Sequence, residues 1–145
     1  MAEIFESAGI TLAYGLIGFV VMAAGFGALD LVTPRRLVEV VWKERNKGAS
    51  IVLSGQMLGV GLVVAQAIRS SEFQEGLGWG LFSTLVYGVA GVLVMTLVFA
   101  IVGIITPGKM GASVMEDHEG RPHPAAWVQG TMYIGTALMV TAALS

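Results

Sequence analysis

The chain has 145 residues, of which 55% are hydrophobic and 12% are charged, with a formal net charge of −2 and no cysteine. A soluble domain carries about twice that share of charged residues, so the composition excludes an ordinary soluble protein. The absence of cysteine excludes disulfides and thiolate metal sites.

Four stretches of the chain contain no charged residue. Each is long enough for a helix to cross the hydrocarbon core of a bilayer, which takes about 20 residues. They cover residues 7–29, 48–68, 76–108 and 124–145. We therefore expect an all-α membrane protein of four transmembrane helices, forming a single integral membrane domain over residues 1–145.

The first stretch does not have the pattern of a cleaved signal peptide. Glu3 and Glu6 precede it, and the first basic residue of the chain is Arg35. We expect this span to remain in the mature protein. Thr33 and Pro34 follow it as an N-cap and a first helical residue, which predicts that a new helix starts there.

The residues after Pro34 favour a short helix at the cytoplasmic membrane interface. Leu37, Val38, Val41 and Trp42 form its apolar stripe, and the polar positions around them are rich in basic residues. The basic residues that we expect to contact lipid or a partner are Arg35, Arg36, Lys43, Arg45 and Lys47.

Asp30 is the acidic residue that adjoins an apolar span near this interface, and two interpretations of it are open. Its carboxylate can pair with Arg35 or Arg36, or accept hydrogen bonds from the restarted helix. Alternatively, it is a proton or cation site. The structural role is the more economical of the two.

The second span carries polar residues at membrane depth. Gln56, Gly59, Val63 and Gln66 share one helical stripe, and Gln129 with Tyr133 and Thr136 is the expected counterpart in the fourth span. An amide facing lipid lacks hydrogen-bond partners, so these side chains should point inward, toward each other, toward Tyr14 and Tyr87, or toward water. They either fix helix register or line a polar path. The candidate intramembrane polar site is Asp30, Gln56, Gln66, Gln129, Tyr14 and Tyr87.

The third span repeats the first at a shift of 73 positions. Residues 11–34 align with residues 84–107 with ten identities in 24 positions, which predicts an internal duplication over about 8–68 and 81–141. Glycines recur at the same register, and small residues let membrane helices approach closely. The glycines expected to pack helices are Gly15, Gly18, Gly55, Gly59, Gly88 and Gly91.

The connection before the fourth span is mixed in character. Thr106 and Pro107 again predict a helix start, and residues 116–123 include carboxylates and two histidines. Their spacing matches no metal site, so we expect a solvated loop and no cofactor. No catalytic motif occurs in the chain, and we expect that it is not an enzyme.

The basic residues predict the orientation of the chain. Seven of the eight lie between spans one and two or between spans three and four, and Arg69 is the exception. The positive-inside rule makes these two connections cytoplasmic and places both termini outside. The two copies then run in the same direction, as two tandem parallel repeats, related by an axis along the membrane normal.

Several runs carry a resemblance to a known family. Asp30-Leu31-Val32-Thr33-Pro34, Glu44-Arg45-Asn46, and residues 49–68 ending in Ala65-Gln66-Ala67-Ile68 resemble the YjfL-type bacterial inner-membrane proteins, a family with a domain of unknown function. The resemblance covers nearly the whole chain. It implies duplicated two-helix units, no assigned catalytic residues, an association with membrane stress, and for residues 121–124 an actinobacterial version.

Two functions fit these patterns best. The first is a non-catalytic scaffold or accessory subunit that docks partner helices, lipid or a peripheral protein. The second is a small ion channel or transporter unit, which requires assembly because four spans rarely enclose a pathway. An intramembrane enzyme fits least well. We expect contact with the lipid bilayer, a homo-oligomer or a larger membrane complex, and no nucleic-acid partner.

Overall fold

The computed structural model describes residues 2–32, 35–71, 76–105, 114, 116 and 120–145. These residues form four α-helices and one short π-helix, and no strand occurs among them. The elements are α1 (Ala2–Val32), η1 (Glu39–Lys43), α2 (Lys47–Ser71), α3 (Leu77–Ile105) and α5 (Pro124–Ala143). The predicted helix starts at Thr33-Pro34 and Thr106-Pro107 lie outside the described residues.

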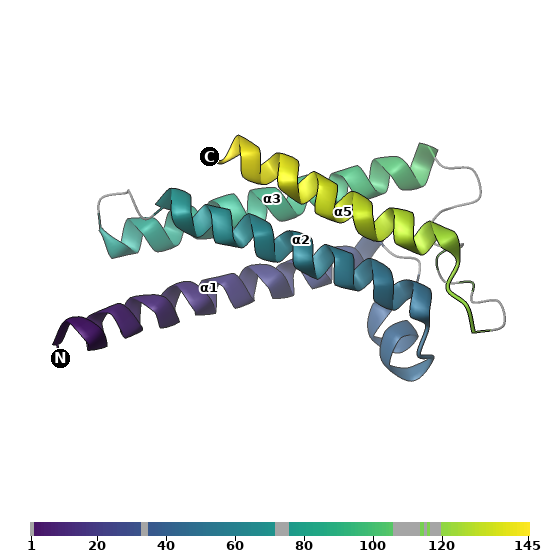
Figure 1. Ribbon diagram of the computed structural model, residues 1–145, viewed down its shortest axis with the longest axis horizontal. Helices are drawn as coiled ribbons and strands as arrows, with labels where there is room; N and C mark the ends of the chain where they lie inside the picture. The colour runs from purple at the N-terminus through teal and green to yellow at the C-terminus, as the bar shows by residue number, and fades with distance from the viewer. Residues whose placement is uncertain (1, 33–34, 72–75, 106–113, 115, 117–119) are drawn as a thin grey trace.

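The four α-helices form an elongated bundle in which the chain runs back and forth (Figure 1). α1 and α3 run in one direction, and α2 and α5 return, so both termini lie toward the same end of the bundle. α2 packs most extensively against α5, and α1 against α3. α2 and α3 also contact each other, and α1 and α5 lie on opposite sides of them.

Three of the helices, α1 from Glu3 onward, α2 and α3, are long and apolar enough to cross a membrane. α5 has 20 residues and does not belong to this group. The prediction of an all-helical protein with membrane-spanning segments is therefore confirmed for three segments, and the fourth span stays a prediction.

Glycines bring α2 close to α5 and α3. A Cβ added to Gly55 would lie 2.5 Å from the Gly130 oxygen and 2.7 Å from its Cα, so the backbones of α2 and α5 touch there. One turn later, a Cβ on Gly59 would lie 2.6 Å from Met95 Cε of α3. Such close approach increases the dispersion contacts that hold helices together in lipid.

The glycines of the first and third helices differ in their surroundings. A Cβ on Gly18 would lie 3.1 Å from Val64, and one on Gly88 would lie 3.0 Å from Val21. Gly91 faces Val63 of α2 even more closely. Gly15 differs, because a Cβ there would meet no atom within 4 Å. Among the described residues, no neighbouring helix therefore packs against Gly15.

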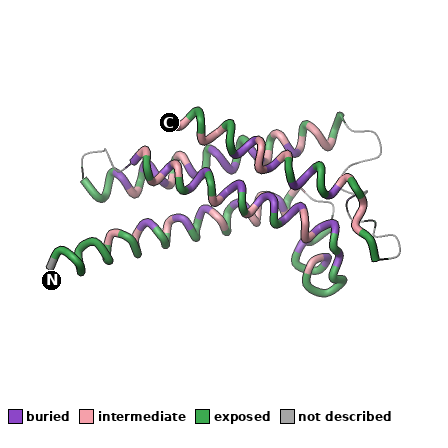
Figure 2. The backbone as a smooth tube through the Cα atoms, viewed as in Figure 1, coloured by how far each residue is buried: buried purple, intermediate pink, exposed green. Residues whose placement is uncertain are grey.

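Burial follows the inward faces of the helices (Figure 2). The core is continuous across the bundle and is built mainly of valine, with Leu29, Met95 and Tyr133 among its larger members. The first turns of α1 are exposed on all sides and extend beyond the other helices (Figure 2). Many large apolar side chains face outward, as expected of a surface covered by lipid.

Candidate functional site

Most hydroxyl groups on the described helices are satisfied within their own helix. The Thr84 hydroxyl donates to the Gly80 carbonyl at 2.9 Å, and the Thr136 hydroxyl donates to the Met132 carbonyl at 2.9 Å. Such bonds to the preceding turn let Ser and Thr lie in an apolar environment without another partner. These residues therefore do not by themselves mark a site.

Three residues break this pattern, and we call Gln56, Gln129 and Tyr133 the central polar cluster. They are 1%, 2% and 2% exposed. Among the buried side chains of the described residues, the polar atoms without a hydrogen-bond partner are Gln56 Oε1, Gln129 Oε1 and the Tyr133 hydroxyl. Each unsatisfied group of this kind costs about 1–3 kcal/mol, so three in one region require an explanation.

The central polar cluster lies where α2 and α5 cross most closely. Gln56 follows Gly55, whose backbone touches Gly130, and Gln129 precedes Gly130. Gln129 and Tyr133 are one turn apart on the same face of α5, and the Tyr133 carbonyl approaches Gly59. Gln129 and Tyr133 therefore share a face of α5, and Gln56 lies on α2 next to the contact between Gly55 and Gly130.

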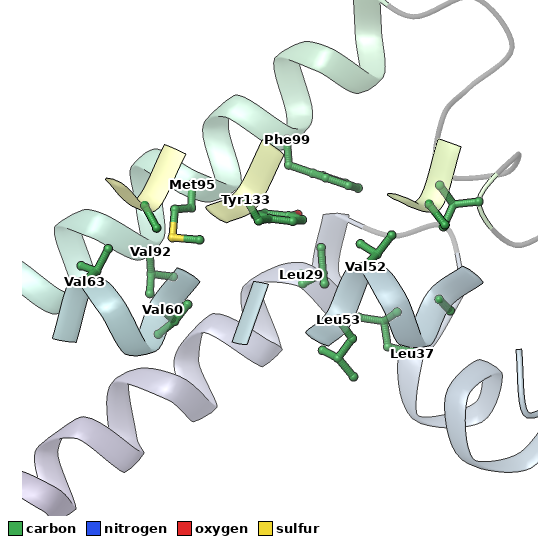
Figure 3. Close-up of a cluster of buried hydrophobic side chains, with 14 of the residues drawn as sticks. Leu29, Leu37, Val52, Leu53, Val60, Val63, Val92, Met95, Phe99 and Tyr133 are labelled. Carbon is green, nitrogen blue, oxygen red and sulfur yellow. The ribbon is translucent and has the colours of Figure 1, made fainter. Parts of the chain in front are cut away.

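The remaining atoms of the cluster are fixed by neighbouring helices. Gln56 Nε2 donates to the Gly25 carbonyl of α1 at 2.8 Å, which orients the amide and leaves Oε1 as its unsatisfied atom. The Tyr133 ring stacks on Phe99 of α3, with centroids 5.6 Å apart and an angle of 13° between the planes (Figure 3). All four α-helices therefore contribute a contact to this region.

A second feature is the basic segment, which we define as residues 35–47. It contains η1 and joins α1 to α2 at the end of the bundle away from the termini (Figure 1). The segment is held from both sides, because Leu37 N–H donates to Asp30 Oδ1 at 2.6 Å and Ala49 N–H donates to Asn46 Oδ1 at 2.8 Å. The first bond ties the backbone before η1 to the end of α1, and the second caps the start of α2.

The side chains of the basic segment divide into an inner and an outer set. Leu37 and Val40 are buried against the bundle. Trp42 is 62% exposed and meets Phe26 of α1 edge to face, with centroids 6.3 Å apart. The predicted apolar stripe is therefore shared between the protein core and the outside, and the placement of this helix at a membrane interface stays a prediction.

Only some of the basic side chains are paired. Arg35 forms an ion pair with Glu44, and Lys43 Nζ lies 3.6 Å from Glu39 Oε1. Lys47 Nζ donates to the Gly120 carbonyl at 2.8 Å. Within the part of the chain that the structure describes, Arg36 and Arg45 are exposed and form no ion pair, so their charges face outward.

The other predicted site residues do not join the central polar cluster. Gln66 lies ten residues further along α2, and its Nε2 is 3.4 Å from Ser70 Oγ, which donates to the Leu144 carbonyl. Tyr14 is buried with its hydroxyl against Gly80, and Tyr87 is half-buried. The structure brings Gln56 and Gln129 to the same crossing. It does not assemble the six predicted residues into one site.

A groove also opens between α2 and α5 on the outer side of their crossing. Its volume is about 380 Å³, and no ionisable side chain lines it. The hydroxyls in its walls donate to carbonyls one turn back along the chain. The groove is therefore largely apolar. It is lined by Ser50, Ile51, Ser54, Gly55, Leu58, Trp127, Gly130, Thr131 and Ile134.

The end of the second connection also has a structural role. His123 is the N-cap of α5, and its Nδ1 accepts from Ala125 N–H at 3.1 Å while Pro124 begins the helix. The sequence analysis did not predict this cap. Among the residues that the structure describes, no group of three His, Asp or Glu side chains is placed to hold a metal ion.

Comparison with known proteins identifies relatives along the whole chain. The family described as Domain of Unknown Function (DUF350) matches residues 3–144. A UPF0719 transmembrane protein of Mycolicibacterium paratuberculosis is 28% identical over 142 residues, which is 98% of this chain and 91% of the relative. UPF0719 transmembrane proteins of Mycobacterium bovis and Mycobacterium tuberculosis are each 30% identical over 147 residues, covering 100% of this chain and 92% of each relative. No solved structure matches the chain.

Proposed function

The chain belongs to the DUF350 family, whose relatives are named transmembrane proteins, and from that premise we propose that it is a non-catalytic membrane scaffold that binds anionic lipid headgroups. In this proposal four helices cross the bacterial membrane and the basic segment lies on the cytoplasmic side. Basic residues at a membrane surface attract anionic lipids, at about 1 kcal/mol per Lys or Arg. The narrower YjfL name stays a prediction.

The observation that carries the proposal is the geometry of the basic segment. Leu37 and Val40 fix it to the bundle, while Arg36 and Arg45 point outward without ion pairs in the described chain. Trp42 stands exposed beside the same end of α1, and tryptophan favours the headgroup level of a bilayer. The basic segment is fixed to the bundle and exposes two arginines and a tryptophan, which is the combination expected of a surface that binds lipid headgroups.

Native mass spectrometry of the protein released from mixed-lipid nanodiscs tests this proposal. Arg36→Gln with Arg45→Gln should weaken the retention of phosphatidylglycerol over phosphatidylcholine by about thirtyfold, since two charges contribute about 2 kcal/mol. Arg69→Gln is the matched control, because Arg69 lies in the last turn of α2 at the opposite end. Equal losses in the control, or no loss in the double variant, would refute headgroup binding by this segment.

A small oligomeric ion channel is the second candidate, and one observation favours it. Gln56, Gln129 and Tyr133 are buried polar residues on the described helices, and polar residues inside a membrane protein often mark ion pathways. Proteoliposomes with a pH or potassium dye distinguish the two functions. A flux that is lost in Gln56→Leu or Asp30→Asn supports a channel, whereas no flux above that of empty liposomes supports the scaffold.

A further inference from the structure

We propose that the groove between α2 and α5 holds one acyl chain of a phospholipid from the leaflet that faces the basic segment. The volume of the groove, about 380 Å³, lies within the range of about 300–1,000 Å³ that is typical of small-molecule sites. Its walls carry apolar side chains and hydroxyls that already donate to carbonyls one turn back. A hydrocarbon chain therefore contacts apolar surface there and takes no hydrogen-bond partner away from these hydroxyls.

Two glycines make room for the groove. Gly55 and Gly130 are among its lining residues, at the point where the backbones of α2 and α5 touch. Because neither residue has a side chain, the touching backbones form the floor, and larger residues such as Leu58 and Trp127 form the walls. These two side chains are 62% and 60% exposed, so the groove opens toward the outside of the bundle. Its occupant therefore enters sideways, from the lipid.

The groove covers only the half of the bundle next to the basic segment. It runs from Ser50 to Leu58 on α2 and from Trp127 to Ile134 on α5. Eight residues of helix rise about 12 Å, and one leaflet contributes about 15 Å of the hydrocarbon thickness. The length of the groove therefore suits an acyl chain of one leaflet. A helix of a second copy that crosses the bilayer would need a seam of about 30 Å, so it fits this groove less well.

Basic side chains stand at the end of the groove where the lipid headgroup would lie. Lys47 is the first residue of α2, three residues before Ser50, and its Nζ donates to the Gly120 carbonyl. This bond brings Arg121, which is exposed, to the same end. Trp127 belongs to the first turn of α5, and tryptophan favours the headgroup level of a bilayer. These cations therefore complement the negative phosphate of a lipid whose chain lies in the groove.

This inference deepens the proposed lipid binding and rests on it for the position of the basic segment at a membrane surface. The two proposals concern different parts of the lipid. Arg36 and Arg45 interact with the charge of the headgroup, whereas the groove interacts with the chain. A change of chain length at a constant headgroup therefore tests the groove by itself.

Native mass spectrometry of the full chain in a mild detergent is the test, with dihexanoyl and dipalmitoyl phosphatidylglycerol as probes. Ser54→Phe puts a ring into the groove from an exposed position on the α2 wall. We expect this variant to lower the retention of the dipalmitoyl lipid by about tenfold, since the ring removes many dispersion contacts with the chain. The retention of the dihexanoyl lipid should fall by clearly less. Thr131→Phe fills the same space from the α5 wall, so the test holds if either variant folds.

Thr11→Phe is the matched control for both variants. Thr11 is exposed on α1, away from the groove, and its hydroxyl also donates one turn back, to the Ser7 carbonyl at 2.9 Å. The control should leave the retention of both lipids unchanged. Equal retention of the dipalmitoyl lipid in the groove variants and in Thr11→Phe would overturn the acyl-chain site.

Dipalmitoyl phosphatidylcholine separates this inference from the proposed function. If the wild-type protein retained both dipalmitoyl lipids equally and the groove variants lost both, the acyl-chain site would stand and headgroup binding would fail. A wild-type dimer that Ser54→Phe or Thr131→Phe dissociates would overturn the acyl-chain site and would show that a second copy occupies the groove.

Discussion

At the scale of single residues, the interior of this bundle separates two kinds of polar side chain. Serine and threonine reach carbonyls one turn back on their own helix, as Thr84 does, and so require nothing from other helices. The longer amides of Gln56 and Gln129 have more hydrogen-bonding groups than their own helix satisfies. Those amides must therefore be satisfied across helices, and Gln56 is, in part, through Gly25.

The sequence predicted the inward direction of the two buried glutamines but not their neighbours. A helical stripe gives the face on which a residue lies, and it does not give the residue opposite. Gln66 lies on the same stripe as Gln56, yet ten residues along a helix is about 15 Å, and Gln66 meets Ser70 near the terminal end instead. Tyr14 likewise packs against Gly80, away from the crossing. Helical periodicity gives the face of a helix on which a residue lies, but it does not show that these residues lie at different heights along the bundle.

The role of Asp30 is testable at this scale. Because Asp30 Oδ1 accepts from Leu37 N–H, Asp30→Ala should destabilise the fold by about 1 kcal/mol through the lost hydrogen bond, measured by thermal unfolding in detergent. Asp30→Asn retains an acceptor and should cost only a few tenths of a kcal/mol. If Asn proved as damaging as Ala, the carboxylate charge, and not the hydrogen bond to Leu37, would be the feature that matters.

At the scale of helices, identical sequence does not mean identical packing. Gly15 and Gly88 occupy the same register of the aligned segments, yet a Cβ on Gly88 meets Val21 and one on Gly15 meets nothing. The reason is position in the bundle, since α3 contacts α1, α2 and α5, whereas α1 lies at the side. Small-residue patterns predict which helices can approach closely, but the partner of each face follows only from the whole arrangement.

The contact between Gly55 and Gly130 gives a prediction for the α2–α5 pair. Gly55→Ala puts a methyl group against the backbone of α5, which cannot move aside as a side chain can, so the helices must separate. We expect a loss of about 1–3 kcal/mol in the free energy of unfolding, measured by steric trapping or denaturant titration in bicelles.

Gly61→Ala is the matched control for this prediction. Gly61 lies on the same helix with nothing within 4 Å of an added Cβ, so alanine there should be neutral or slightly stabilising through helix propensity. A Gly55→Ala variant as stable as Gly61→Ala would show that the two backbones are not in contact.

At the scale of the whole molecule, charge and hydropathy predicted more than motifs did. Charge segregation alone indicated helices in a membrane, and the described helices and the transmembrane relatives agree. The packing of Leu37 into the core could not be predicted, because it depends on where separate segments meet. The caps at Asn46 and His123 are local and were missed, because the sequence analysis placed no helix start at either residue. The duplication also stays a prediction. The parallel course of α1 and α3 fits it, but the two copies have different neighbours.

The orientation of the bundle in the membrane is the prediction that belongs to this scale. The bundle places residues of both termini at one end and the basic segment at the other, and the positive-inside rule puts the basic end in the cytoplasm. The chain has no cysteine, so single cysteines can report exposure without removing native ones. Ser7→Cys and Ser145→Cys should react with a membrane-impermeant maleimide in intact cells, and Lys43→Cys only after permeabilisation.

Each outcome of the labelling has a distinct structural meaning. If Ser7→Cys and Ser145→Cys reacted on opposite sides, α5 would not cross the bilayer, and three spans would remain. If Lys43→Cys reacted in intact cells while both terminal cysteines were protected, the bundle would be inverted, and the basic segment would meet the outer leaflet. The predicted pattern requires an even number of crossings, and with α1, α2 and α3 already long enough to span, α5 supplies the fourth.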